Sequence, residues 1–376
     1  MALIAGAGLL SAPAAARVLS APAAQPHASR VLAPRAVAAT PAGRCGTEPT
    51  TGAAWERLFD SLRGSWAGGD GAASLRLPDG RMLWLFGDTF TGSVRSDGSR
   101  GSDSQIVHNS IVVTSGSCAR VLPTASAALP GRAGTWLWPT AGVVSTRGAK
   151  GRASTITVFA QRVRRTGTGA FDFEQVGTAV ATLTVPWSGV PTVGRVRDLP
   201  RSRTLWGAGL IADGATTWIY GTRAVHEPWV FGRDLLLARA PTARLADVAS
   251  WTYRTRTGWT ADADDAVVVR PARDGVSTVP SAVRIGTTFV LVTKAQEFLD
   301  PTVVALTSTR AWGPWTEAPL FRAAGSGSVL RYSPAVVAGA ARARLIVVVS
   351  RTSTSLSQLA ADVEVARPTF TDVRLR

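Results

Sequence analysis

The chain repeats one pattern of apolar runs and turn residues, and this pattern predicts β-strands. An apolar run of small residues leads into a turn that usually contains glycine, and a second run rich in β-branched or aromatic residues follows. Such residues favour strands, whereas Gly, Asp and Pro favour turns. The pattern occurs five times. First strands are predicted at 72–77, 139–145, 206–212, 280–285 and 334–338, and second strands at 82–86, 155–159, 217–220, 288–292 and 345–349.

The five units recur at intervals of about 55 to 75 residues, which suits four-stranded sheets with long loops. Further strands are predicted at 109–114, 178–185, 235–238 and 303–307. Five such units predict an all-β, five-bladed β-propeller over residues 52–376. A β-sandwich or two stacked β domains is the alternative, but no Pro/Ser-rich linker divides the chain after residue 52. One amphipathic helix is expected at 53–62, where Trp55, Leu58, Phe59 and Leu62 share a face.

The N-terminal segment resembles an export signal. Residues 1–24 are rich in Ala, Leu and Pro, contain no acidic residue, and have Ala-x-Ala-like sites near Ala14 and Ala23. The apolar run is too short to span a bilayer, although no Lys or Arg precedes it. We expect a signal peptide at 1–24, a disordered lead-in at 25–51, and a secreted mature chain with no integral membrane segment.

Cysteine and histidine usage limits the covalent and metal chemistry. In an exported chain the two cysteines, Cys45 and Cys118, predict one disulfide, and two unrelated buried thiols are the alternative. The three histidines do not form a zinc pattern. We predict no cofactor and no metal site, and a structural Ca²⁺ in the propeller channel has no ligand signature.

The formal charge of +16 raises the question of a nucleic-acid partner. Only Lys150 and Lys294 are lysines, and the arginines are spread singly along the chain without a basic arm or a recognition helix. This distribution argues against nucleic-acid binding. Long-range attraction to anionic polymers fits it better. We expect a monomer.

In a propeller, the first strands start and the second strands end at the same mouth. This rule brings together aromatic, amide and charged side chains, which is an arrangement typical of sugar sites. Glu227 follows one strand and Asn109 precedes another, and both could reach the same place. The alternatives are a solvated loop acid for Glu227 and a strand-end cap for Asn109. The predicted substrate-binding residues are Asn109, Trp138, Trp206, Arg223, Glu227, Lys294, Tyr332 and Arg351.

Asp70 and Asp88 are the strongest catalytic candidates. They lie at equal distances on either side of Asp79, the centre of the first hairpin turn, so they should face each other. Two facing carboxylates cannot both ionise freely, which raises the pKa of one of them. One acid and one base are what glycosidic cleavage needs. The alternative is structural, with Asp70 capping a turn and Asp88 accepting backbone hydrogen bonds.

The segments Gly68-Gly69-Asp70-Gly71, Asp79-Gly80-Arg81, 83–89 (LWLFGDT) and His108-Asn109-Ser110 resemble a secreted bacterial family of five-bladed propellers. The family was formerly of unknown function and is now associated with endo-D-arabinanase activity. The likeness covers about residues 55–376, and its specific part is confined to the first unit. It implies that Asp70 and Asp88 are the catalytic pair and that the substrate is D-arabinan.

The residues and the resemblance together predict a secreted glycoside hydrolase that cleaves furanosidic linkages in a cell-wall polysaccharide. The alternative is a non-catalytic carbohydrate-binding or interaction propeller with the same pocket. Opposite hairpin positions place Cβ atoms about 5 Å apart, which favours the short carboxylate separation of retaining enzymes. The sequence leaves open the linkage, endo or exo action, and which aspartate is the acid.

Overall fold

The computed structural model describes residues 45–122, 126–132, 134–169, 172–339 and 344–375. The predicted signal peptide and most of the predicted lead-in lie outside these ranges. The described chain is all-β, as predicted, with six sheets and two short α-helices. No helix in these ranges is long and apolar enough to cross a membrane.

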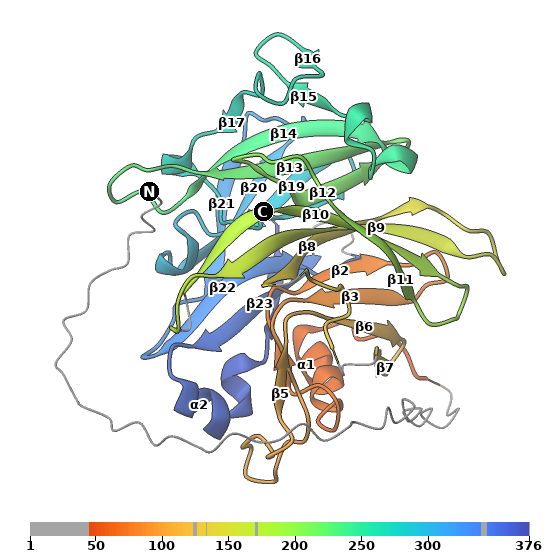
Figure 1. The fold of residues 1–376 in the computed structure, drawn as a ribbon, viewed down its shortest axis with the longest axis vertical. Helices are drawn as coiled ribbons and strands as arrows, with labels where there is room; N and C mark the ends of the chain where they lie inside the picture. Colours follow the sequence, from red (N-terminus) through yellow and green to blue (C-terminus); the bar gives the residue numbers. More distant parts are fainter. Residues whose placement is uncertain (1–44, 123–125, 133, 170–171, 340–343, 376) are drawn as a thin grey trace, which may run out of the picture. The chain divides into compact units, whose positions relative to one another are not determined.

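Five of the sheets follow one another along the chain (Figure 1). The first contains β2 (Ala73–Arg76), β3 (Met82–Phe86), β6 (Ser110–Ser115) and β7 (Cys118–Val121). The second contains β8 (Thr135–Thr146), β9 (Ser154–Arg165), β10 (Phe173–Val185) and β11 (Thr192–Asp198). The third contains β12 (Leu205–Asp213), β13 (Thr216–Ala224), β14 (Arg233–Pro241), β15 (Thr252–Arg254), β16 (Trp259–Thr260) and β17 (Val268–Arg270).

The fourth sheet contains β18 (Ser281–Ile285), β19 (Thr288–Thr293), β20 (Thr302–Ser308) and β21 (Thr316–Arg322). The fifth contains β22 (Val329–Val336), β23 (Arg344–Ser353) and β24 (Thr369–Arg374). In both of these sheets each strand pairs antiparallel with the next strand along the chain. The five predicted strand pairs overlap the first two strands of each sheet, and the predicted third strands overlap β6, β10, β14 and β20.

Each hydrophobic core lies between two successive sheets, because side chains on a strand alternate between its faces. In β3, Leu83 and Leu85 pack towards the second sheet, whereas Trp84 and Phe86 pack towards the fifth. Other cores join the second sheet to the third, the third to the fourth and the fourth to the fifth. Burial on both faces explains why β3 is apolar throughout.

The first strands of the five sheets contact one another in chain order. β2 contacts β8, β8 contacts β12, β12 contacts β18, and β18 contacts β22. β22 also contacts β2, and the Ala338 N–H donates a 2.8 Å hydrogen bond to Ser74 Oγ. The fifth sheet therefore lies beside the first, as the adjoining blue and orange strands of Figure 1 show.

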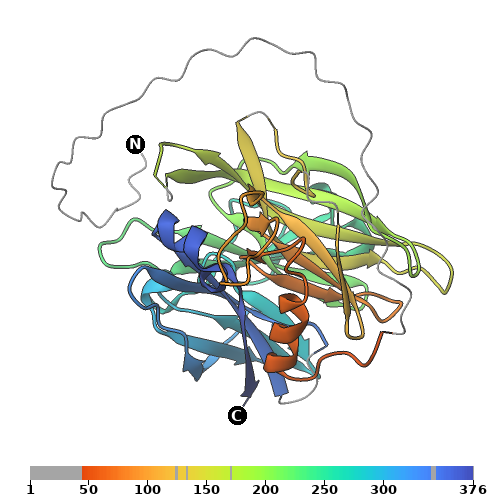
Figure 2. The ribbon, with the colours of Figure 1, turned by 90° about the horizontal axis from the view of Figure 1, so that it is seen from below.

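The predicted helix is confirmed as α1 (Gly52–Asp60), which follows the N-cap residue Thr51. The Thr51 side chain accepts a hydrogen bond from the Ala54 N–H, as Thr does at helix starts. Its buried face carries Trp55 and Phe59, which pack beside β24 (Figure 2). α2 (Leu356–Ala361) follows β23.

Residues 45–51, which we expected in a disordered lead-in, are held against the first sheet. The predicted disulfide between Cys45 and Cys118 is present, with an S–S distance of 2.11 Å. Glu48 forms an ion pair with Arg76 of β2. The ordered part of the chain thus begins before residue 52.

Candidate active site

A small additional sheet extends the first hairpin and sets the positions of Asp70 and Asp88. It contains β1 (Gly68–Gly69), β4 (Thr89–Thr91) and β5 (Gln105–Val107). β1 pairs with β4 in the same register as β2 with β3, so the two aspartates between the ladders occupy opposite positions. The Asp70 N–H donates to the Asp88 carbonyl at 3.1 Å. The predicted juxtaposition along the backbone is confirmed.

Asp70 is half-buried and lies under the side chain of Tyr332. The Tyr332 hydroxyl donates to Asp70 Oδ2 at 2.5 Å. Burial, followed by the charge of Asp88, raises the pKa of Asp70 to about 7, although the hydrogen bond from Tyr332 opposes the shift. The Asp70 carboxyl therefore keeps its proton to much higher pH than an ordinary aspartate.

An irregularity in β22 accompanies the placement of Tyr332. The β22–β23 register shifts between Tyr332 and Ala335, and Ser333 has a φ of 44°. An extra residue in a strand bends it and re-aims nearby side chains, and such bulges are frequent beside active sites. Tyr332 pairs with Ser350 of β23, whose hydroxyl accepts from the Gly71 N–H at 2.9 Å. The fifth sheet thus supports the segment that carries Asp70.

Two ring nitrogens lie within hydrogen-bond distance of Asp88 Oδ1, and the Asp88 side chain stays 35% exposed. The Trp138 indole Nε1–H donates to Asp88 Oδ1 at 2.8 Å. His108 Nδ1 lies 3.0 Å from the same oxygen and donates when that nitrogen carries the proton. Trp136 stacks on the His108 ring at 4.5 Å between centroids. This arrangement fits a fixed carboxylate that solvent and substrate can reach.

Gly87 leaves room for the Asp70 carboxylate. A Cβ atom at this position would lie 2.6 Å from Asp70 Oδ1 and 3.5 Å from Trp138 Cδ1. The Thr89 hydroxyl donates to the Gly87 carbonyl at 2.9 Å and fixes the turn. A side chain at position 87 would therefore displace the Asp70 carboxyl from its place.

Of the predicted substrate-binding residues, the structure brings Trp138 and Tyr332 to the aspartates. Asn109 has a different role, because its fully buried amide is used by backbone groups. Its Nδ2 donates to the carbonyls of Leu129 and Leu137, and its Oδ1 accepts from the Leu129 N–H. Trp206 is also not a sugar platform. It is buried in the core between the second and third sheets, beside Tyr253.

Three charged residues predicted at the mouth have partners elsewhere. Lys294 is buried, and its ammonium donates to the carbonyls of Ala323 and Arg331. Burial lowers the pKa of Lys294 to about 8. Arg223 pairs with Asp234. Glu227 is an exposed loop residue paired with Arg273 at 2.9 Å.

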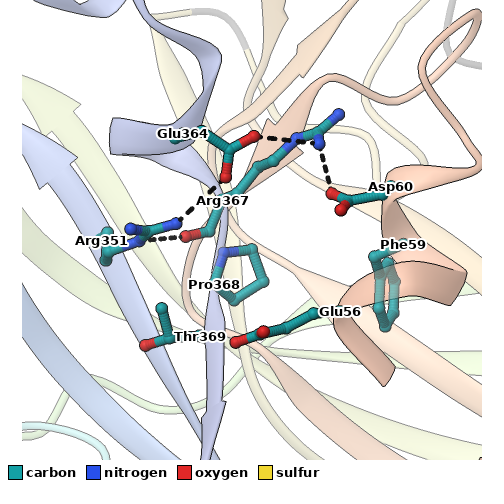
Figure 3. A pocket seen from close by; sticks show the side chains of 8 residues that line it. All are labelled: Glu56, Phe59, Asp60, Arg351, Glu364, Arg367, Pro368 and Thr369. Carbon is teal, nitrogen blue, oxygen red and sulfur yellow. Dashed lines mark hydrogen bonds and ion pairs between the residues drawn. The ribbon is translucent and has the colours of Figure 1, made fainter. Parts of the chain in front are cut away.

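Arg351 lines a separate cavity of about 230 Å³ between α1, β23 and the start of β24 (Figure 3). Its Nε donates to the Arg367 carbonyl at 2.6 Å. Because side chains alternate along a strand, Arg351 points away from the face that Ser350 presents to the Asp70 segment. We predicted Arg351 as a substrate-binding residue from its position at the end of a second strand, without regard to this alternation. The other lining residues are Glu56, Phe59, Asp60, Glu364, Arg367, Pro368 and Thr369.

Sequence reasoning missed His108, Trp136 and Ser350 as parts of this site. His108 was visible in the His108-Asn109-Ser110 motif, yet the adjacent Asn109 was chosen as the functional residue. Ser350 carries no local signal, because it meets Gly71 through packing between the first and fifth sheets. Among the residues with described positions, no group of three His, Cys, Asp or Glu side chains could hold a metal ion.

Comparison of structures places the chain in a class of all-β proteins. A protein of Bacteroides ovatus ATCC 8483, described as a "putative hydrolase", shares the fold with a TM-score of 0.68 and 18% identity. The match covers 85% of this chain and 89% of the other. The family model "Domain of unknown function (DUF5005)" matches residues 53–355, and the chain belongs to this family. The resemblance to a family catalogued as a domain of unknown function is confirmed.

More distant structural similarities were also found. The catalytic domain of a Coprinopsis cinerea GH62 alpha-L-arabinofuranosidase is 10% identical, with a TM-score of 0.45 over 82% of this chain and 91% of that one. A GH43_1 enzyme from Xanthomonas citri is 11% identical, with a TM-score of 0.46 over 86% and 93% of the two chains. No curated protein sequence matches the chain.

Proposed function

We propose that the five successive sheets are the blades of a five-bladed β-propeller. The contacts between neighbouring first strands, including β22 with β2, support this arrangement. The cores between successive sheets support it as well, because each blade of a propeller packs on two neighbours. Asp70 and Asp88 then lie at the mouth where second strands end.

The protein acts as a glycoside hydrolase in which Asp70 and Asp88 are the catalytic carboxylates. One observation carries this proposal. The two acids occupy opposite positions, yet one has a raised pKa and the other is an exposed carboxylate held by N–H donors. Carboxyl groups whose environments separate their roles in this way are what glycosidic cleavage requires.

Asp70 is the general acid, since it retains a proton near neutral pH and can give it to the leaving glycosidic oxygen. Asp88 is the base that activates water, or the nucleophile that attacks the anomeric carbon. Trp138 and His108 hold the Asp88 carboxylate in place, and Tyr332 holds the Asp70 carboxyl. These three side chains are positioning residues.

The substrate class is a furanose-containing cell-wall polysaccharide, and D-arabinan is the favoured candidate. The motifs around Asp70 and Asp88 support this choice through their resemblance to the D-arabinan-cleaving family. Secretion fits the disulfide between Cys45 and Cys118, because such bonds persist in oxidising compartments. The enzyme would meet its polymer outside the cell.

The test is a product profile for the wild-type protein on D-arabinan, L-arabinan and other furanose glycans. We expect new reducing ends on D-arabinan and oligosaccharide products of graded length, as endo cleavage gives. Release on another furanose glycan alone would reassign the substrate. Glycan binding without any release over long incubation would reject the enzyme and favour a carbohydrate-binding propeller.

A further inference from the structure

Two loops carry every exposed aromatic side chain in the described part of the chain. The first loop, residues 225–232, follows β13, and the second, residues 294–301, follows β19. Trp229 is 88% exposed, Phe231 40%, Phe298 51% and Leu299 52%. Exposed aromatic residues that gather in one place mark binding surfaces more often than scattered ones do. We name these four residues the rim platform.

Hydrogen bonds join the two loops, so the rim platform has a defined structure. Gln296 Oε1 accepts from the N–H groups of Phe231 and Gly232 at 2.8 and 3.0 Å. Gln296 Nε2 donates to the Arg273 carbonyl at 3.2 Å. A Cβ atom on Gly232 would lie 2.3 Å from the Ala295 carbonyl oxygen, so the two backbones are in direct contact.

Each of the two loops contains one residue in a strained backbone conformation. Trp229 has a φ of 63° and Glu297 a φ of 54°, which side-chain-bearing residues rarely adopt. The Glu297 carboxylate accepts from the backbone N–H and the hydroxyl of Thr278 and lies 3.7 Å from Arg233. These contacts anchor the second loop to Thr278 and Arg233. Strain of this kind persists where the surroundings enforce it, often at binding sites.

The second loop lies beside the strand that carries Tyr332. The second loop contains a 3-10 turn, Glu297–Leu299, that contacts β22, the strand carrying Tyr332. Lys294 also donates to the carbonyl of Arg331, the residue before Tyr332. Both loops follow second strands of their sheets, as Asp88 does. The rim platform is therefore linked to the proposed catalytic pair through β22 and Tyr332.

We propose that the rim platform binds the polysaccharide substrate at sugar units remote from the bond that is cleaved. This inference rests on the proposed function. Aromatic faces stack on the C–H faces of sugar rings, and the exposed Glu227–Arg273 pair offers hydrogen-bonding groups to hydroxyls. Four exposed side chains are far fewer than the roughly 20 to 30 residues that each partner contributes to a stable protein interface. A glycan chain fits such a narrow surface.

The test measures D-arabinan affinity in an Asp88→Asn background, which prevents turnover during binding. Trp229→Ala and Phe298→Ala should each weaken D-arabinan binding about tenfold. Val190→Ala, an exposed apolar position on the β10–β11 turn, is the matched control and should leave the affinity unchanged. In the otherwise wild-type enzyme, both aromatic variants should raise KM on the polymer and leave kcat/KM on an aryl arabinofuranoside unchanged.

Undiminished polymer affinity in both aromatic variants would overturn the rim platform, even if the wild-type enzyme cleaves D-arabinan. An oligomer that dissociates on Trp229→Ala would overturn it too, because a second copy would then be the occupant. Weakened binding in a protein that never cleaves glycans would instead keep the rim platform and reject the hydrolase. Circular dichroism of each variant verifies the fold.

Discussion

Two effects raise the pKa of Asp70, and a hydrogen bond from Tyr332 lowers it. Burial and Asp88 raise the pKa of Asp70, whereas the Tyr332 hydroxyl lowers it by donating to the charged form. The balance near 7 suits a group that must hold and release a proton at neutral pH. Tyr332 therefore limits how far the pKa of Asp70 rises.

Tyr332→Phe removes this donor and should raise the pKa of Asp70 further. The proposed general acid acts in its protonated form, so the alkaline limb of the kcat–pH profile should move to higher pH, by about half a unit to one unit. The profile is measured on D-arabinan for wild type and variant. An alkaline limb that stays in place or moves to lower pH would contradict the assignment of Asp70 as the acid.

Gly87→Ala should reduce activity without much loss of stability. The added Cβ would meet the end of the Asp70 side chain, which can turn aside, so the fold survives while the carboxyl leaves its position. We expect at least a tenfold fall in kcat and a change of under about 1 kcal/mol in unfolding free energy. Gly258→Ala, where no atom lies within 4 Å of the new Cβ, is the control. Equal kcat in both variants would contradict the geometry.

Sequence reasoning at the residue scale succeeded where position along one hairpin decides proximity. Asp70 and Asp88 follow from the turn at Asp79 alone. It failed for Asn109 and Arg351, whose partners come from backbone carbonyls and from the alternation of side chains along β23. Contacts that form between sheets, such as Ser350 with Gly71, have no signal in the local sequence.

At the scale of elements, the strands were predictable because the residues that form each hairpin are close together in the sequence. Runs such as 82–86 are apolar throughout and are bounded by turn residues, so β3 was predicted at its true bounds. β13 and β23 start close to the predicted residues but extend beyond the predicted ends. The long extensions of β9 and β10 were missed, because the charged Arg164, Arg165 and Glu174 interrupt the apolar runs there. Residues 45–51 were misplaced because the anchor that orders them is a distant cysteine.

The disulfide should supply much of the order in the segment before α1. The bridge joins positions 73 residues apart, and closing a loop of that size stabilises a fold by about 4 kcal/mol in the chain-entropy model. Cys45→Ser/Cys118→Ser should lose an amount of this order in urea unfolding. Wild type under reducing conditions is the matched control and should lose the same amount. An unchanged unfolding midpoint in both samples would contradict the prediction.

For the whole molecule, the raised pKa of the half-buried Asp70 makes stability depend on pH. The folded pKa of Asp70 is about 7, above the ordinary value of 3.8, so its contribution to stability is complete below about 3.8. That contribution is lost as pH rises through about 7. The site thus costs stability under the conditions in which the enzyme works.

Asp70→Asn removes this titration. From pH 5 to pH 8, the variant should gain about 2 kcal/mol of unfolding free energy relative to wild type. Asp265→Asn, at an exposed position, is the control and should show no such gain. Urea unfolding at both pH values measures the difference. A constant difference between Asp70→Asn and wild type would show that Asp70 has an ordinary pKa.

The account as a whole depends on two facing aspartates that break glycosidic bonds. Its most direct test is the initial rate of reducing-end release from D-arabinan by wild type, Asp70→Asn and Asp88→Asn, each shown to be folded. We predict measurable release by wild type and a loss of at least about a hundredfold in each variant. Release at the wild-type rate by either folded variant would contradict the account.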